Sequence, residues 1–285
     1  MSRHETRTGA RAAVRRQGVR AGAAVAGFAL ALMAPSAALY AQRGAPQPTA
    51  TAQAAAPVDL TGQWVSMVTQ DWRWRMITPP KGDYRGIPMT AEAWKVAEAW
   101  DPARDEKAGE QCKSYGAPAL MSVPGRVRIS WQDAETLKVE TDAGTQTRLL
   151  RFKSQPGARR APRSWQGDSA AEWQVARGNA PLNLRPAERT PGVPPPAIGR
   201  GGTLKVVTTN LRAGYLRKNG VPYSEDTVLT EYWEVLKRDN GEQWLTITTL
   251  VEDPKYLRQT RMVAIPFKKE AGGAAWDPTP CSARW

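Results

Sequence analysis

The chain has 285 residues, which is enough for one large domain or two smaller ones. It carries 40 basic and 27 acidic side chains, a formal net charge of +13, and a single histidine, His4. Because His4 lies in a leader that we expect to be removed, the composition excludes catalysis by imidazole and zinc or non-haem iron sites built on imidazole. We expect neither a metal nor a cofactor.

Residues 1–41 have the features of a signal peptide. A basic start is followed by a thirteen-residue apolar stretch at 21–33, which is long enough for a secretory h-region and too short for a membrane-spanning helix. Small residues then offer cleavage sites after Ala38 or Ala41. An uncleaved anchor is the alternative to cleavage. We therefore expect a periplasmic or secreted protein without a transmembrane span in its mature form.

The leader leaves the export route open, and the charge of the mature chain bears on its partners. The pair Arg15-Arg16 leaves both the general secretory route and the twin-arginine route open. Removing the leader takes away six arginines and one glutamate, which leaves 34 basic and 26 acidic residues and a net charge of +8. Such a surface can face anionic glycans or lipid headgroups, or can simply be solvated. We expect no nucleic-acid partner, and the oligomeric state stays open.

Composition divides the remainder of the chain into a linker and one domain. Residues 42–57 are rich in Ala, Pro, Gln and Thr and predict a flexible linker. Residues 58–285 are expected to form a single domain. Within that domain the Pro-rich segment 176–200 shows no periodicity and predicts an inserted surface loop.

Strands are the dominant expectation for the domain. Residues 126–152 contain three runs of alternating apolar and polar residues separated by short turns, which is typical of an antiparallel meander. A hairpin turn is expected at Asp239-Asn240-Gly241. One helix is expected at 90–100, with Thr90 as its N-cap. Further strands are expected at 203–211, 227–236, 244–251 and 258–268.

The first expected strand contains tryptophans that are candidates for core packing and for ligand binding. It begins at a Gly-x-Trp sequence ending in Trp64, and Trp72, Trp74 and Met76 share the parity of Trp64, so the strand is expected to run on to Met76. Core packing suits Trp64. Trp72 and Trp74 are candidates for an aromatic ligand platform.

Two resemblances add to this interpretation. The Gly-x-Trp opening resembles that of lipocalins and other calycin barrels, which implies a mainly β fold in which the meander closes into a lipocalin-like barrel. Residues 110–260 also resemble a family of uncharacterised secreted bacterial proteins, and this resemblance implies export and a barrel-like fold but no activity. It rests on Trp165-x-Gly167-x-Ser169 with Trp173, Thr203–Thr209, Gly220-Val221-Pro222-x-Ser224, Glu231 and Asp253-Pro254-x-Tyr256.

Two charged residues are expected to point into the barrel. Arg148 shares the parity of Leu150, and Glu231 shares the parity of Trp233. Buried charges are costly unless they are paired. The two residues are therefore expected to pair with each other, or to contact a polar ligand, unless the parity assignment fails.

The remaining polar candidates have structural interpretations. Asp168 and Ser169 are interpreted as part of a polar turn, and Asp253 as the cap of the turn before a proline. Cys112 and Cys281, the two cysteines of an exported chain, predict a disulfide.

The favoured function is binding without catalysis. A small or oligomeric ligand, such as a glycan, would lie in an aromatic-lined barrel cavity formed by Trp72, Trp74, Arg148 and Glu231. One alternative is a histidine-free enzyme that uses carboxylates on glycans, which needs two carboxylates about 5–9 Å apart. The other is a structural envelope protein with a filled core.

Overall fold

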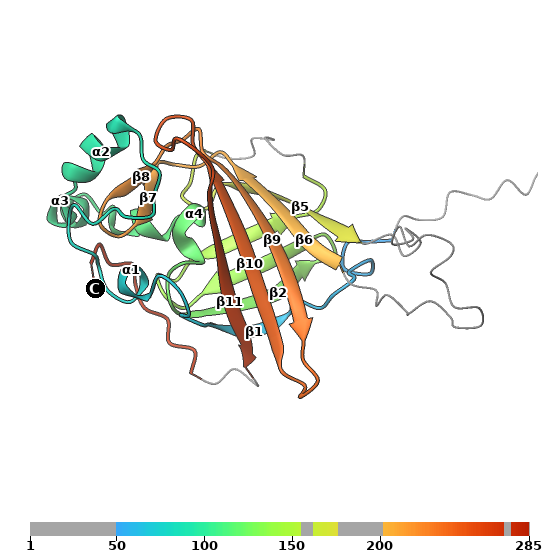
Figure 1. Ribbon diagram of the computed structural model, residues 1–285. Coiled ribbons are helices and arrows are strands. Elements are labelled where there is room, and N and C mark those ends of the chain that lie inside the picture. The colour runs from blue at the N-terminus through green and yellow to red at the C-terminus, as the bar shows by residue number, and fades with distance from the viewer. Residues whose placement is uncertain (1–49, 155–161, 176–201, 271–274, 285) are drawn as a thin grey trace, which may run out of the picture. The chain divides into compact units, whose positions relative to one another are not determined.

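The domain is a closed β-barrel (Figure 1). The computed structural model describes residues 50–154, 162–175, 202–270 and 275–284. Within these ranges nine strands close in the order β1-β11-β10-β9-β6-β5-β4-β3-β2. They are β1 Gly62–Ser66, β2 Arg126–Asp133, β3 Thr136–Thr141, β4 Thr147–Arg151, β5 Asp168–Val175, β6 Gly202–Thr209, β9 Val228–Lys237, β10 Gln243–Glu252 and β11 Arg261–Glu270. The predicted mainly β barrel is confirmed.

Most neighbours in the barrel are antiparallel and adjacent in sequence, as a meander requires. The exception is the parallel pairing of β4 with β5, in which Leu150 lies opposite Ser169. The barrel closes where β1 pairs with both β2 and β11. The predicted hairpin turn at Asp239-Asn240-Gly241 joins β9 to β10. The Pro-rich segment 176–200 lies outside the described residues.

Helices and a small hairpin gather at one end of the barrel (Figure 1). The predicted helix is present, and Thr90 caps it by accepting a hydrogen bond from the Ala93 N–H. The other short elements were not predicted. The elements at this end are α1 Trp72–Arg75, α2 Ala91–Glu98, α3 Pro102–Lys107, the 3-10 helix η1 Gln111–Tyr115, α4 Ala117–Leu120, β7 Gly214–Arg217 and β8 Val221–Tyr223. None of the described helices is long and apolar enough to cross a membrane.

The interior of the barrel is filled with side chains. Alternate residues of each strand point inward, so the strands contribute to one hydrophobic cluster. Its largest members are Trp64, Trp233 and Phe267, which are at most 1% exposed. The Trp64 indole N–H donates to the Leu60 carbonyl, which satisfies the polar atom of that buried ring.

The first strand is shorter than expected, and this corrects the environment of two tryptophans. β1 ends at Ser66, and Trp72 and Trp74 lie in the four-residue helix α1. Asp71 precedes that helix with a φ of 54°, a left-handed conformation that is incompatible with a continuing strand. The prediction of a strand running to Met76 is wrong.

The end of the expected linker contacts the barrel. Ala52 is 8% exposed, and its carbonyl accepts a hydrogen bond from the Trp173 indole. The Gln53 N–H donates to the Ala134 carbonyl. Residues 51–57 therefore pack onto the domain, in contrast to the flexible linker expected at 42–57.

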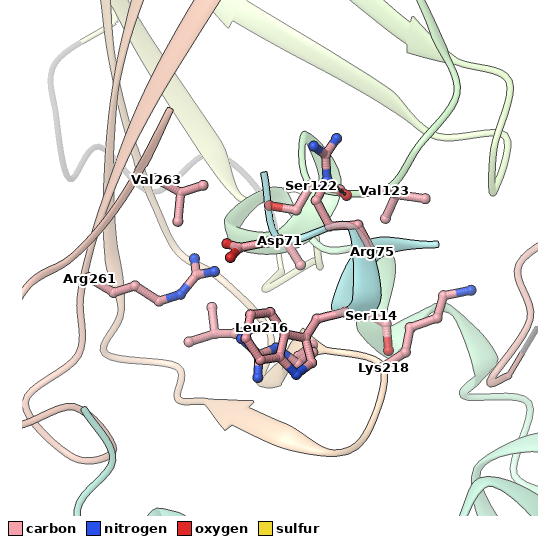
Figure 2. Close-up of a pocket in the computed structure, with 12 residues that line it drawn as sticks. Asp71, Arg75, Ser114, Ser122, Val123, Leu216, Lys218, Arg261 and Val263 are labelled. Atoms are coloured by element: carbon pink, nitrogen blue, oxygen red, sulfur yellow. Dashed lines mark hydrogen bonds between the residues drawn. The ribbon is translucent and has the colours of Figure 1, made fainter. Parts of the chain in front are cut away.

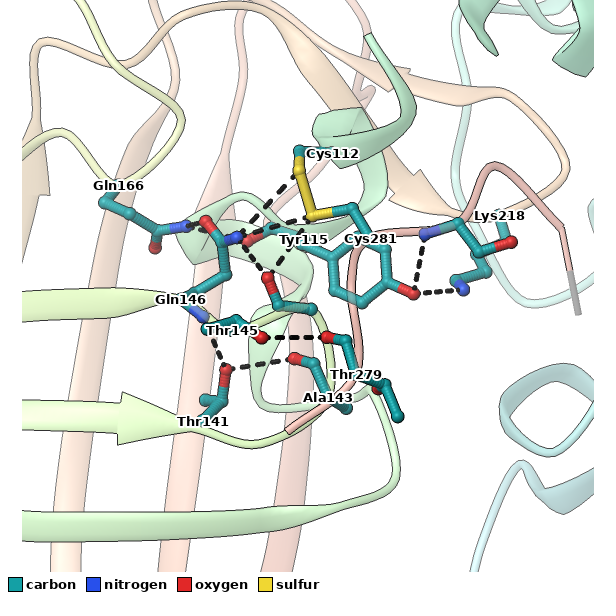
Figure 3. The surroundings of a disulfide bond; sticks show 12 residues. Cys112, Tyr115, Thr141, Ala143, Thr145, Gln146, Gln166, Lys218, Thr279 and Cys281 are labelled. Carbon is teal, nitrogen blue, oxygen red and sulfur yellow. Dashed lines mark hydrogen bonds between the residues drawn. A yellow bond between two sulfur atoms is a disulfide. The ribbon is translucent and has the colours of Figure 1, made fainter. Parts of the chain in front are cut away.

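The predicted disulfide between Cys112 and Cys281 is present (Figure 3). It joins η1 to the C-terminal tail across 169 residues of sequence. Next to it, the Tyr115 hydroxyl accepts hydrogen bonds from the Ser282 N–H at 3.3 Å and from the Lys218 ammonium at 2.7 Å. The tail is thereby held against the same end of the barrel as the helices.

Candidate functional site

A pocket rich in arginine lies at the helical end of the barrel (Figure 2). Its volume is about 40 Å³, which is room for about three water-sized groups. It is lined by residues of α1, η1, α4 and β7 and by the first residues of β11. We call it the arginine pocket and define it by its charged residues: Asp71, Arg75, Arg217, Lys218 and Arg261.

Arg75 is buried although its hydrogen bonding is incomplete. It is 5% exposed. Its Nε donates to the Ser122 carbonyl and its Nη2 to the Ser66 hydroxyl, both at 2.8 Å. Its Nη1 has no hydrogen-bond partner in the part of the chain that the structure describes. Burial lowers the pKa of this guanidinium, so the surroundings disfavour its charge.

Arg217 links the β7–β8 hairpin to the segment that follows α1. It is 8% exposed, and its guanidinium donates to the carbonyls of Asp83 and Arg85. Its Cζ lies 4.8 Å from the centre of the Trp74 ring, a cation–π contact. Burial, followed by the positive charge of Arg261, lowers the pKa of Arg217 to about 10. Two like charges therefore face each other across the pocket.

Arg261 and Asp71 form the polar wall on the β11 side. Figure 2 shows the Arg261 guanidinium turned towards the Asp71 carboxylate. Burial lowers the pKa of Arg261, and the charge of Asp71 opposes that shift. Among the described residues that line this pocket, Asp71 supplies the one negative charge. A second carboxylate, that of Asp83, is not part of the pocket lining and is bound by Arg73, Arg85 and the Trp74 indole.

Lys218 lies at the edge of the pocket. It is 4% exposed, and Figure 2 shows its side chain extending away from Arg261. The ammonium donates to the Tyr115 hydroxyl and lies 4.5 Å from the centre of that ring. Burial lowers the pKa of Lys218 to about 7. Its charge therefore changes near neutral pH, whereas the arginines remain protonated.

A second charged group lies inside the barrel and does not touch this pocket. Arg148 and Glu231 form a bidentate ion pair with N–O distances of 2.6 and 3.0 Å, and both side chains are 0% exposed. Arg148 also donates to the Thr208 hydroxyl, which lies 2.7 Å from the hydroxyl of Ser169. The parity argument therefore placed both charges correctly, and the expected pairing is confirmed.

The structure separates the four predicted site residues. Trp72 is 66% exposed, whereas Trp74 is half-buried at the arginine pocket. Arg148 and Glu231 lie on β4 and β9 inside the filled barrel. The expected grouping in a single interior cavity is not seen, and contact of these residues with a ligand stays a prediction.

Two further sequence interpretations change. Asp168 and Ser169 begin β5 rather than forming a polar turn, and Ser169 is 3% exposed. Asp253 does cap its turn, accepting from the N–H groups of Lys255 and Tyr256. Its carboxylate also accepts hydrogen bonds from the backbone N–H and the hydroxyl of Ser224, so it fixes the turn to the segment that follows β8.

The cations of the arginine pocket were not among the predicted site residues. One usable signal was the sequence Lys218-Asn219-Gly220 between short apolar runs, which is typical of a hairpin turn. That signal predicts the hairpin but not the burial of its charges. Burial follows from the packing of segments that are far apart in sequence.

The arginine pocket combines chemical groups that suit an anion. It offers guanidinium donors, a tryptophan face and a carboxylate that can orient an arginine. Comparison with protein-family models, with curated proteins and with solved structures finds no match to this chain. The function is therefore argued from the geometry and charge of the site.

Proposed function

We propose that this protein is an exported binding protein that holds a small oxyanion, or the anionic head of a larger ligand, in the arginine pocket. The observation that carries the proposal is an excess of positive charge in the lining of the pocket, where Arg75 and Arg217 are buried and Arg261 is half-buried. Arg75, Arg217 and Arg261 carry three positive charges and Asp71 one negative charge, which leaves a net +2 before Lys218 is counted. Buried charges of one sign are costly unless a partner offsets them.

The hydrogen-bonding capacity of the pocket supports the same ligand class. Nη1 of Arg75 is a buried donor without a partner among the described residues. An unsatisfied buried donor costs about 1–3 kcal/mol, and more when it is charged. A guanidinium presents its N–H groups as a planar fork that matches the oxygen atoms of carboxylate, sulfate and phosphate. An oxyanion would satisfy Arg75 and reduce the repulsion between Arg217 and Arg261.

The size of the pocket limits what enters it. With room for about three water-sized groups, it fits a carboxylate, sulfate or phosphate group and leaves the rest of a larger ligand outside. A dianionic group neutralises the net +2 of the arginines and Asp71, so we expect phosphate and sulfate to bind more tightly than acetate. The Trp74 ring beside Arg217 offers an apolar face to whatever is attached to the anion.

Binding at the end of the barrel is also consistent with the filled interior. The strands' inward side chains form a continuous hydrophobic cluster, and the arginine pocket lies beyond it among α1, α4 and β7. The barrel then serves as a rigid support for the site. A carboxylate-based enzyme needs two carboxylates facing one cleft, and Asp71 is the one that lines this pocket in the described part of the chain.

The proposal is tested by calorimetry with inorganic phosphate, sulfate and acetate. Arg261→Gln is the informative variant, because Arg261 is only partly buried and lies at the first residue of β11. Loss of one charge-assisted contact of about 1.5–3 kcal/mol weakens phosphate binding by about tenfold or more. Arg258→Gln is the matched control, since Arg258 is exposed three residues earlier and does not line the pocket.

Three results would contradict the proposal. The first is that none of the three anions binds at millimolar concentration. The second is that Arg258→Gln weakens phosphate binding as much as Arg261→Gln, which would indicate a general effect of net charge. The third is that chloride at equal ionic strength competes as well as sulfate, which would indicate screening rather than a site.

A further inference from the structure

A second pocket at the same end of the barrel differs in size and lining from the arginine pocket. Its volume is about 400 Å³, and its lining includes residues of α2 and of the β7–β8 hairpin. These two elements lie side by side in Figure 1. This volume falls within the range of about 300–1,000 Å³ that is typical of small-molecule sites. We call it the tyrosine pocket and define it by Tyr215, Tyr223, Tyr256, Lys95 and Arg104.

The floor of the tyrosine pocket is aromatic and apolar. Tyr215 from β7 and Tyr223 from β8 are buried, and Pro222, the middle residue of β8, lies opposite Tyr215 in the hairpin. Val96 from α2 and Ala99, just after that helix, form the facing wall. The accessible apolar surface of the pocket comes from Ala99, which is exposed, and from Val96 and Tyr256, which are half-buried. A planar ring lying on this surface buries apolar area at little entropic cost.

The aromatic residues of the floor and wall are held in place before any ligand arrives. The Tyr215 hydroxyl donates to the Asp105 carboxylate at 2.8 Å, and this carboxylate also binds Lys113. Burial and the charge of Asp105 raise the pKa of Tyr215 above its usual range, so the hydroxyl stays protonated. Tyr256 lies in the turn whose backbone N–H groups are bound by Asp253. Such preorganisation lowers the cost of binding.

The rim of the tyrosine pocket is positively charged. Lys95 and Arg104 are exposed at its edge, and Lys113 lies deeper, where Asp105 and Glu110 pair with it. In the described part of the chain, none of the residues that line this pocket carries a carboxylate. Lys95 and Arg104 therefore favour a negatively charged group at the edge of the pocket.

We infer that the tyrosine pocket binds an aromatic carboxylate, with the ring between α2 and the hairpin and the carboxylate at Lys95 and Arg104. This site is independent of the oxyanion site proposed above, because the two pockets have no lining residue in common. Gly214 and Tyr215, at the start of β7, line the tyrosine pocket, whereas Leu216 and Arg217, at its end, line the arginine pocket. A neutral aromatic ligand should bind more weakly because it cannot make the charged contact with Lys95 and Arg104. Acetate should bind more weakly because it has no aromatic ring.

The test uses the full chain with 1-naphthoate as the probe, followed by calorimetry and saturation-transfer NMR. Naphthoate is expected to bind, and the neutral 1-naphthamide and acetate to bind at least tenfold more weakly. The double variant Lys95→Gln/Arg104→Gln is expected to weaken naphthoate binding at least tenfold. Its matched control is Lys81→Gln/Lys107→Gln, which removes the same charge at two exposed positions that do not line the pocket.

A filling variant separates the pocket from the charge of its rim. Ala99→Phe places a ring where the ligand's ring would lie, at an exposed position just after α2, and is expected to abolish naphthoate binding while the thermal midpoint stays near that of the wild type. Arg261→Gln is expected to leave naphthoate binding unchanged. The inference is overturned if naphthoate does not bind at millimolar concentration, if the control pair matches the rim pair, or if Arg261→Gln removes naphthoate binding and Ala99→Phe does not.

Discussion

Replacing Arg148 with methionine should be among the most damaging single changes inside the barrel. Glu231 would stay at 0% exposure but lose both N–H donors of the guanidinium, now at 2.6 and 3.0 Å. Breaking a buried pair by removing one partner costs about 3–5 kcal/mol, because the other charge remains buried and unpaired. For a domain of this size, 1 kcal/mol corresponds to about 2–4 °C, so the midpoint should fall by about 6–20 °C.

The companion variants test whether the loss arises from the unpaired charge. Glu231→Gln keeps the shape of the side chain and removes the charge, so it should lower the stability by less than Arg148→Met. In the double variant no uncompensated carboxylate remains, and the loss should be smaller than the sum of the single losses. Urea unfolding with the disulfide intact measures all four proteins. The reasoning is refuted if Arg148→Met costs less than about 1 kcal/mol, or if the single losses add.

Three further predictions concern the buried lysine, the disulfide and the leader. Burial lowers the pKa of Lys218 to about 7, whereas a lysine in the unfolded chain has a pKa of about 10.4. Between these pH values the unfolded chain binds more protons, so the stability measured by urea unfolding should rise with pH from about 7 to about 10. The Lys218→Met variant should flatten this rise. Replacing both Cys112 and Cys281 with serine should lower the stability by at most about 5 kcal/mol in the chain-entropy model. If non-reducing mass spectrometry of exported protein found two free thiols, the disulfide would be absent from that protein. N-terminal sequencing of exported protein should begin after residue 38 or 41, and a start at Met1 would exclude cleavage.

Period-two patterns predicted the barrel strands well because those strands are long. In β9 and β10, ten residues alternate between the interior and the outside, and the parity of Glu231 follows from its neighbours. The same argument placed Arg148 on the inner face. Between Trp72 and Arg75 only four residues alternate, and a pattern of that length also fits one helical turn. The left-handed conformation of Asp71, which redirects the chain there, has no clear signal in the sequence.

The candidate sites were harder to predict because they are tertiary features. Arg75, Arg217 and Arg261 come from three segments that are far apart in sequence, and each is of a residue type that is exposed in most proteins. The tyrosine pocket likewise combines α2 with a hairpin that was not predicted. The Cys112–Cys281 bond was predictable because two cysteines in a chain that is expected to be exported allow one intramolecular pairing.

The closure of the barrel between β1 and β11 has a consequence for how the chain is made. Gln63 and Glu270, which face each other across that seam, are 207 residues apart in sequence. The seam cannot form until the ribosome has released nearly the whole chain, which takes on the order of 10–60 s at about 5–20 residues per second. During that time β1 has one unpaired edge that can recruit another nascent chain. Dependence on so distant a contact also places folding in the slower, millisecond-to-second range that is typical of β topologies.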